Sequence, residues 1–115
     1  MSGTDYTPGG AASGPGEQGQ YTRDSGFLSY FEICQKVKNE NWTVVKDEQI
    51  GSVYAFKKGS VKQWVGYENP ETLQLRCKYI IDEGLAGVMF WDTSLDDLTG
   101  QDYTVSCIIY KDLAN

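Results

Sequence analysis

The sequence contains no histidine, and only three of its 115 residues are cysteine. The absence of histidine excludes a histidine general base and the usual histidine-containing zinc sites. Three cysteines are too few for a small disulfide scaffold, and none shows the C-x-x-C spacing of zinc ligands. From the residues alone they are either three buried thiols or one disulfide and one further thiol. We therefore predict neither a metal nor a cofactor.

Positive charge and long apolar runs are also scarce. Ten basic residues face 16 acidic ones, for a net charge of −6, and no basic stripe is present to neutralise the phosphates of a nucleic acid. The longest apolar run, 85–91, is too short to cross a bilayer. The opening stretch MSGTDYTPGG lacks the charged and apolar regions of a signal peptide. These features predict no nucleic-acid or membrane partner, and either a cytosolic protein or an internal piece of a longer one.

What the sequence does contain is enough apolar material for one globular domain, with 40% hydrophobic and 13% aromatic residues. The first twenty residues differ from the rest, because they hold six glycines and two prolines but only one aromatic, Tyr6. Composition alone predicts a loop or a flexible tail there. Asn41-Trp42-Thr43 is a glycosylation sequon, which has meaning only if the protein is secreted.

Periodicity predicts one helix and three strands in the first half of the chain. Residues 25–37 place Phe27, Phe31 and Cys34 at helical spacing, with Ser25 as a plausible N-cap. Aromatic and β-branched residues predict strands at 42–46, 52–57 and 61–67, and KKGS at 57–60 joins the last two as a hairpin.

A second helix and a further strand follow. Asn69 as cap and Pro70 at the first helical position predict the helix start, and Gly84 its end. The expected buried face comprises Leu73, Cys77, Ile80 and Ile81. Residues 86–91 are apolar throughout, which predicts a strand covered on both faces. The tail at 104–113 fits a strand or a helix, and periodicity does not decide between them.

The end of the 86–91 run holds the candidate site residues. Three acids follow it, Asp92, Asp96 and Asp97, and two of them could form a catalytic carboxylate pair at a strand's carboxyl end. The favoured interpretation is a solvated loop with an aspartate as helix N-cap. Trp91 could stack on the apolar face of a sugar ring, although a place in the core is favoured from the residues alone.

Two longer stretches carry a family resemblance. SGPGEQGQYTRDSGFLSYFEIC at 13–34 combines a glycine-rich run, a Tyr-Thr-Arg-acid step and a Tyr-Phe-Glu-Ile-Cys element, and QWVGYENPETLQLRCKYIIDEGLAGVMFWDTSLDD spans 63–97. In this order they resemble the C-terminal portion of glycoside hydrolase family 18, the chitinases and chitinase-like proteins. The resemblance covers roughly residues 9–100. It implies an α+β fold in which a chitinase insertion domain, an antiparallel sheet plus a helix, precedes the last helix–strand unit of a (β/α)8 barrel.

The resemblance also implies domain bounds and roles for single residues. Residues 1–67 would form a partial insertion domain with a glycine-rich loop at 1–20, and 68–115 the C-terminal helix–strand part of the barrel. Trp91 would form the floor of the cleft beside the cleaved bond, and Asp24 and Phe27 would lie on its wall. The resemblance further implies a disulfide between Cys34 and Cys107. Cys77, on the second helix, would remain a thiol.

The family's catalytic signature, D-x-x-D-x-D-x-E, does not occur in the sequence. The resemblance therefore implies a chito-oligosaccharide-binding part of a secreted chitinase, with no catalytic residue in this chain. Its expected partners are chitin or N-acetylglucosamine oligomers, together with the remaining barrel segments or a second copy. Two alternatives are a fragment of a non-catalytic chitinase-like lectin or growth-factor-type protein and a structural interaction domain.

Overall fold

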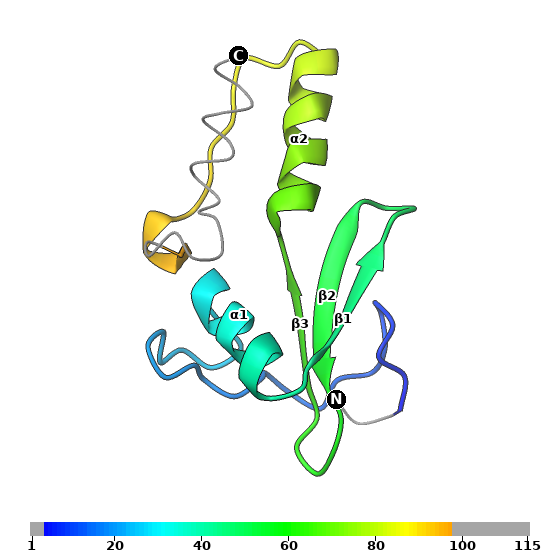
Figure 1. Ribbon diagram of the computed structural model, residues 1–115, viewed down its shortest axis with the longest axis vertical. Helices are drawn as coiled ribbons and strands as arrows, with labels where there is room; N and C mark the ends of the chain where they lie inside the picture. The colour runs from blue at the N-terminus through cyan, green and yellow to red at the C-terminus, as the bar shows by residue number, and fades with distance from the viewer. Residues whose placement is uncertain (1–3, 98–115) are drawn as a thin grey trace.

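The computed structural model describes residues 4–97. It combines two helices, three strands and one 3-10 turn in an α+β arrangement, which Figure 1 shows. In chain order these are α1 (Tyr30–Asn39), β1 (Thr43–Asp47), β2 (Ser52–Lys57), β3 (Gln63–Tyr67), α2 (Pro70–Asp82) and η1 (Thr93–Leu95).

The strands form an antiparallel sheet in the order β1-β2-β3. The predicted hairpin of the last two strands is confirmed, with Ala55 opposite Val65, and β1 pairs with the other edge of β2. The central strand β2 is buried along Val53–Phe56. Its alternating apolar residues face both sides of the sheet, so each face requires a cover.

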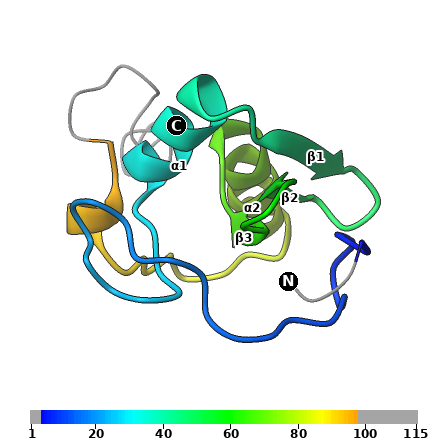
Figure 2. The same ribbon diagram turned by 90° about the horizontal axis from the view of Figure 1, so that it is seen from below.

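The N-terminal segment covers one face of the sheet. The Tyr6 ring stacks on Phe56 at a centroid distance of 4.4 Å, and Trp64 Nε1 donates a hydrogen bond to the Tyr6 carbonyl at 3.0 Å. Glu17 N donates to Gln63 Oε1 at 3.0 Å. Figure 2 shows this segment passing beneath the sheet. The glycine-rich start is therefore a loop packed on the sheet and not a flexible tail.

Helix α1 lies beside the sheet (Figures 1 and 2). Its Tyr30 ring contacts Tyr67 of β3 at a centroid distance of 6.4 Å, and its Ile33 is buried. Ala55, wholly buried at the centre of β2, shares a face with its pairing partner Val65. A small residue at this position lets the neighbouring layers approach the sheet closely.

The predicted N-cap of the first helix is wrong by four residues. The helix begins at Tyr30, not Ser25, and Ser29 is its N-cap in a reciprocal capping box with Glu32. Gly26, with a φ of +83°, interrupts the predicted helix, since helical residues have negative φ. Phe27 therefore belongs to a loop and is 49% exposed.

The predicted start of α2 is confirmed, with Asn69 as N-cap and Pro70 at the first position. Gly84 follows its end with a φ of +62°, as expected for a residue just past a helix. The predicted buried face is only partly correct. Leu73 and Cys77 are buried, whereas Ile81 is 57% exposed.

The strand predicted at 86–91 is not formed among the described residues. The segment is extended but has no ladder partner in 4–97, and Met89 and Trp91 are 79% and 82% exposed. The prediction required covering elements on both faces, whereas within 4–97 the segment lines a cavity and is otherwise exposed. The predicted element at 104–113 and Cys107 lie outside the described residues.

Candidate functional site

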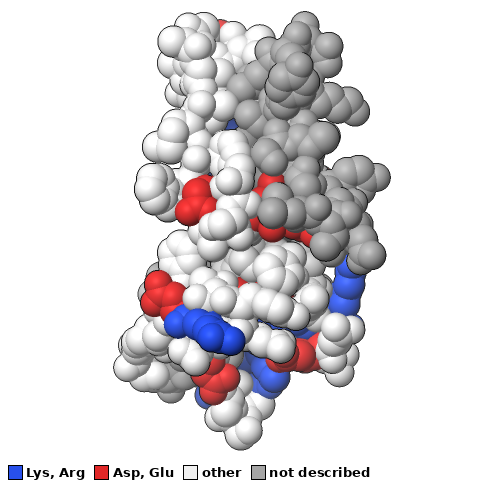
Figure 3. All heavy atoms as spheres, turned by 90° about the vertical axis from the view of Figure 1, so that its left-hand side faces the viewer, with Lys and Arg blue, Asp and Glu red and all other residues white. Residues whose placement is uncertain are grey.

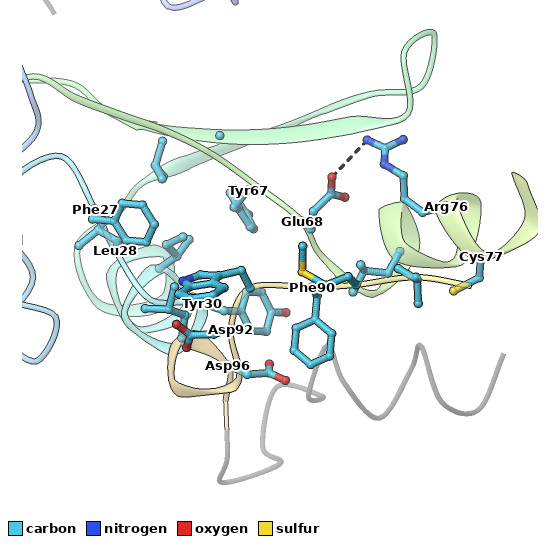
Figure 4. A pocket seen from close by; sticks show the side chains of 18 of the residues that line it. Phe27, Leu28, Tyr30, Tyr67, Glu68, Arg76, Cys77, Phe90, Asp92 and Asp96 are labelled. Carbon is cyan, nitrogen blue, oxygen red and sulfur yellow. Dashed lines mark hydrogen bonds and ion pairs between the residues drawn. The ribbon is translucent and has the colours of Figure 1, made fainter. Parts of the chain in front are cut away.

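A cavity of about 550 Å³ lies among α1, β3, α2 and the segment that follows α2. Figure 4 shows that its labelled side chains come from all four of these parts of the chain. Six of the 21 residues that line it are aromatic: Phe27, Tyr30, Tyr67, Tyr79, Phe90 and Trp91. An apolar cavity of this size with a few polar groups at its edge is the usual form of a small-molecule site.

Trp91 presents its indole at the edge of this cavity. It follows an extended segment, and Asp92 directly after it caps η1 by accepting a hydrogen bond from Ser94 N at 2.8 Å. The Ser94 hydroxyl donates to the same carboxylate oxygen, and the Trp91–Asp92 peptide bond is cis. The capping role considered for an aspartate in this loop is thus confirmed for Asp92, whereas Asp96 and Asp97 are buried, not solvated.

Phe27 reaches the cavity from the loop before α1. Its amide donates to the Asp24 carbonyl at 3.2 Å, and the Gly26 amide donates to the Gly16 carbonyl at 2.9 Å. The first bond closes a turn within the loop, and the second ties the loop to the glycine-rich segment. Asp24 is exposed and does not line the cavity.

Two charged side chains that form an ion pair also line the cavity. Arg76 of α2 pairs with Glu68 at 3.2 Å, and Figure 4 shows both side chains beyond Tyr67. Burial raises the pKa of Tyr67 to about 12, with a further contribution from Cys34. A tyrosine hydroxyl is protonated at neutral pH with or without this shift, so Tyr67 can donate a hydrogen bond.

Charge is sparse over much of the adjoining surface. On the face seen in Figure 3, uncharged side chains cover most of the described upper half, and acidic side chains gather at mid-height of the molecule. Within residues 4–97, no group of three or more cysteine, aspartate or glutamate side chains could hold a metal ion. The helices in this range are also too short or too polar to cross a membrane. A surface with few charges, most of them acidic, suits a neutral ligand better than a polyanion.

The structure brings together two of the three predicted wall and floor residues. Phe27 and Trp91 line the same cavity, although they are far apart in the sequence. Cys34 lies on α1, half-buried, and its pairing with Cys107 stays a prediction because Cys107 is outside the described residues.

Sequence reasoning missed three further residues that line the cavity. Tyr30, Tyr67 and Glu68 line it, but their spacing shows only a helix start and a strand end. The available signal was the position of Tyr67 and Glu68 at the carboxyl end of β3, where binding residues often gather.

The described residues thus form an α+β unit with one partly apolar cavity among its elements. The family model described as Glycosyl hydrolases family 18 matches residues 1–96. The chain belongs to this family. Probable chitinase 10 of Drosophila melanogaster is 43% identical over 88 residues, 76% of this chain and 4% of that protein. Chitinase-3-like protein 2 of Homo sapiens is 38% identical over 101 residues, 88% of this chain and 25% of that protein.

Solved structures show the same relationship. Human YKL-39, described as a pseudo-chitinase with retained chitooligosaccharide binding properties, superposes with a TM-score of 0.87 at 31% identity, over 100% of this chain and 32% of that one. Catalytic domain 2 of the Ostrinia furnacalis Group II chitinase superposes with a TM-score of 0.86 at 30% identity, over 99% of this chain and 30% of that one. The chain thus spans about a third of each of these two structures.

Proposed function

We propose that this chain binds chito-oligosaccharides by forming part of the wall and floor of a sugar cleft. The observation that carries the proposal is the convergence of Phe27 and Trp91 on one aromatic-lined cavity. The indole of Trp91 is 82% exposed, so its face is available to stack on the apolar face of a sugar ring. Tyr67 and Glu68 supply polar groups that could orient sugar hydroxyls, and Asp24 would contact the sugar from the wall, outside the cavity itself.

The proposal extends to how the chain fits into a larger fold. Residues 68–97 would be the last helix–strand unit of a (β/α)8 barrel, following an insertion domain within 1–67. This arrangement accounts for the extended but exposed segment around Met89, because neighbouring strands of a barrel would cover it. Secretion and a Cys34–Cys107 disulfide belong to the same proposal.

The proposal assigns sugar binding but no catalytic residue to this chain. The sequence contains no D-x-x-D-x-D-x-E motif to provide the general acid. Human YKL-39 is a pseudo-chitinase that retains chitooligosaccharide binding, and its similarity favours a non-catalytic, lectin-like protein as a second candidate. A D-x-x-D-x-D-x-E motif with an intact terminal Glu elsewhere in a longer protein would favour an enzyme, and a replaced Glu would favour a lectin.

Calorimetric titration with a soluble N-acetylglucosamine oligomer tests the sugar-binding role. We expect Trp91→Ala to weaken binding at least about tenfold, because a few aromatic contacts carry most of the binding energy of a site. The matched control is Ile50→Ala, which truncates another exposed apolar side chain, 60% exposed, in the turn between β1 and β2. Equal affinities for the two variants would count against the proposal.

A further inference from the structure

A single carboxylate holds the loop that carries Phe27. We name residues 23–28 the wall loop. Just before it, Tyr21 N and Thr22 N donate hydrogen bonds to Glu32 Oε1 at 2.7 and 3.2 Å, and the Thr22 hydroxyl donates to Oε2. Just after it, Ser29 N and Ser29 Oγ donate to Oε2, each at 3.0 Å. Glu32 therefore binds both ends of the wall loop.

The surroundings of Glu32 are built around this carboxylate. The side chain belongs to the first turn of α1 and is only 3% exposed, so its charge requires internal partners. Gly19 lies directly against it, and a Cβ atom at Gly19 would overlap the carboxylate. Five hydrogen bonds exceed what a capping box needs, since the N-cap backbone amide is the only donor that the box assigns to this position.

We propose that Glu32 is a positioning residue of the sugar site: it closes the wall loop at both ends and so holds Phe27 at the cavity. The inference rests on the proposed function, since it concerns the same site. Glu32 itself does not line the cavity, so it acts through the loop and not by touching the sugar. Without these bonds, the loop would sample other conformations, and each departure would remove Phe27 from the wall.

Two substitutions at Glu32 distinguish the hydrogen bonds at one end of the wall loop from those at the other. Glu32→Ala removes all five bonds. Glu32→Gln can keep its oxygen toward Tyr21 and Thr22, while its amide donates to the Thr22 and Ser29 hydroxyls, which can rotate to accept. It then loses only the bond from Ser29 N. The matched control is Thr72→Ala, because Thr72 occupies the equivalent position in the capping box of α2 and does not line the cavity.

Amide hydrogen exchange without ligand is the first measurement. We expect Glu32→Ala to speed exchange at Tyr21, Thr22 and Ser29, and Glu32→Gln to speed it at Ser29 alone. Thr72→Ala should leave all three amides unchanged. Circular dichroism would verify that each variant is folded. Equal exchange at these amides in Glu32→Ala and Thr72→Ala would overturn the proposal.

Binding of the same N-acetylglucosamine oligomer is the second measurement. If the loop of Glu32→Ala occupies the binding conformation about a tenth of the time, its apparent Kd rises about tenfold. Glu32→Gln should lie between it and the unaltered chain, and Thr72→Ala should bind as the unaltered chain does. An unchanged Kd in Glu32→Ala, with weakened binding in Trp91→Ala, would overturn the role of Glu32 and leave the proposed function intact. No binding by the unaltered chain would overturn the proposed function and, with it, this role.

Discussion

The buried carboxylate of Glu32 predicts a specific loss of stability in acid. Burial alone would raise its pKa, but hydrogen bonds from the Thr22 side chain and from the backbone amides of Ser29, Tyr21 and Thr22 outweigh burial and lower the pKa to about 2, from 4.5. A carboxyl group whose pKa is lower in the folded state stabilises the fold above its unfolded pKa. That contribution is lost as the pH falls through the folded pKa.

The size of the loss follows from the shift. The difference between 4.5 and about 2 corresponds to about 3 kcal/mol at 1.36 kcal/mol for each pKa unit. The side chain is only 3% exposed, so little solvent screening reduces this value. The contribution of Glu32 should be present in full above about pH 5 and nearly absent at pH 2.

Urea unfolding of the unaltered chain and of Glu32→Gln at several pH values between 7 and 2 would measure this effect. Other carboxyl groups also titrate in this range, including Asp5 and Glu40, whose pKa values hydrogen bonds lower. They are present in both proteins and cancel in the difference. We expect the stability advantage of the unaltered chain to shrink by about 3 kcal/mol over this range. Two curves that stay parallel down to pH 2 would refute the reasoning.

Three further substitutions test the fold. Ala55→Leu should destabilise it by about 1–3 kcal/mol through overpacking, because Ala55 is wholly buried at the centre of the sheet; a urea midpoint that did not fall would disprove tight packing there. Gly84→Ala should lower the free energy of unfolding by about 1 kcal/mol. The reason is the φ of +62° at Gly84, since no atom would crowd the added methyl. A thermal scan without any decrease in Tm would contradict this. Trp91→Ala should change the free energy of unfolding by less than about 0.5 kcal/mol, because the indole is 82% exposed, and a larger loss by urea titration would assign it a structural role.

Local chemistry was sufficient to predict much of the fold. The strands and the start of α2 were predictable because β-branched runs, KKGS and the Asn69-Pro70 pair act over a few residues. The start of α1 was predicted wrongly because Phe27 matches a helical period. The better signal was the S-x-x-E spacing of Ser29 and Glu32, a capping box that marks a helix start more sharply than periodicity.

The candidate site was less predictable, because it depends on contacts between distant segments. The residues suggested Trp91 from its place after an apolar run, and family resemblance added Phe27. Neither source predicted that Tyr67 would lie between α1 and α2, since that depends on how the helices sit against the sheet. The exposure of the 86–91 segment was missed for a related reason: periodicity reports that residues are apolar and not what covers them.

The contact of Tyr6 with the sheet has a consequence for how the chain folds. The three strands follow one another closely, so their pairing requires only short loops to close, whereas the bond from Trp64 to Tyr6 joins residues 58 positions apart. Closing a longer loop costs more chain entropy, and distant contacts form more slowly than local ones. We expect the strands to pair first, and the aromatic face of Phe56 and Trp64 to stay open to other chains until the N-terminal segment docks. A concentrated refolding mixture would be most prone to association during that interval.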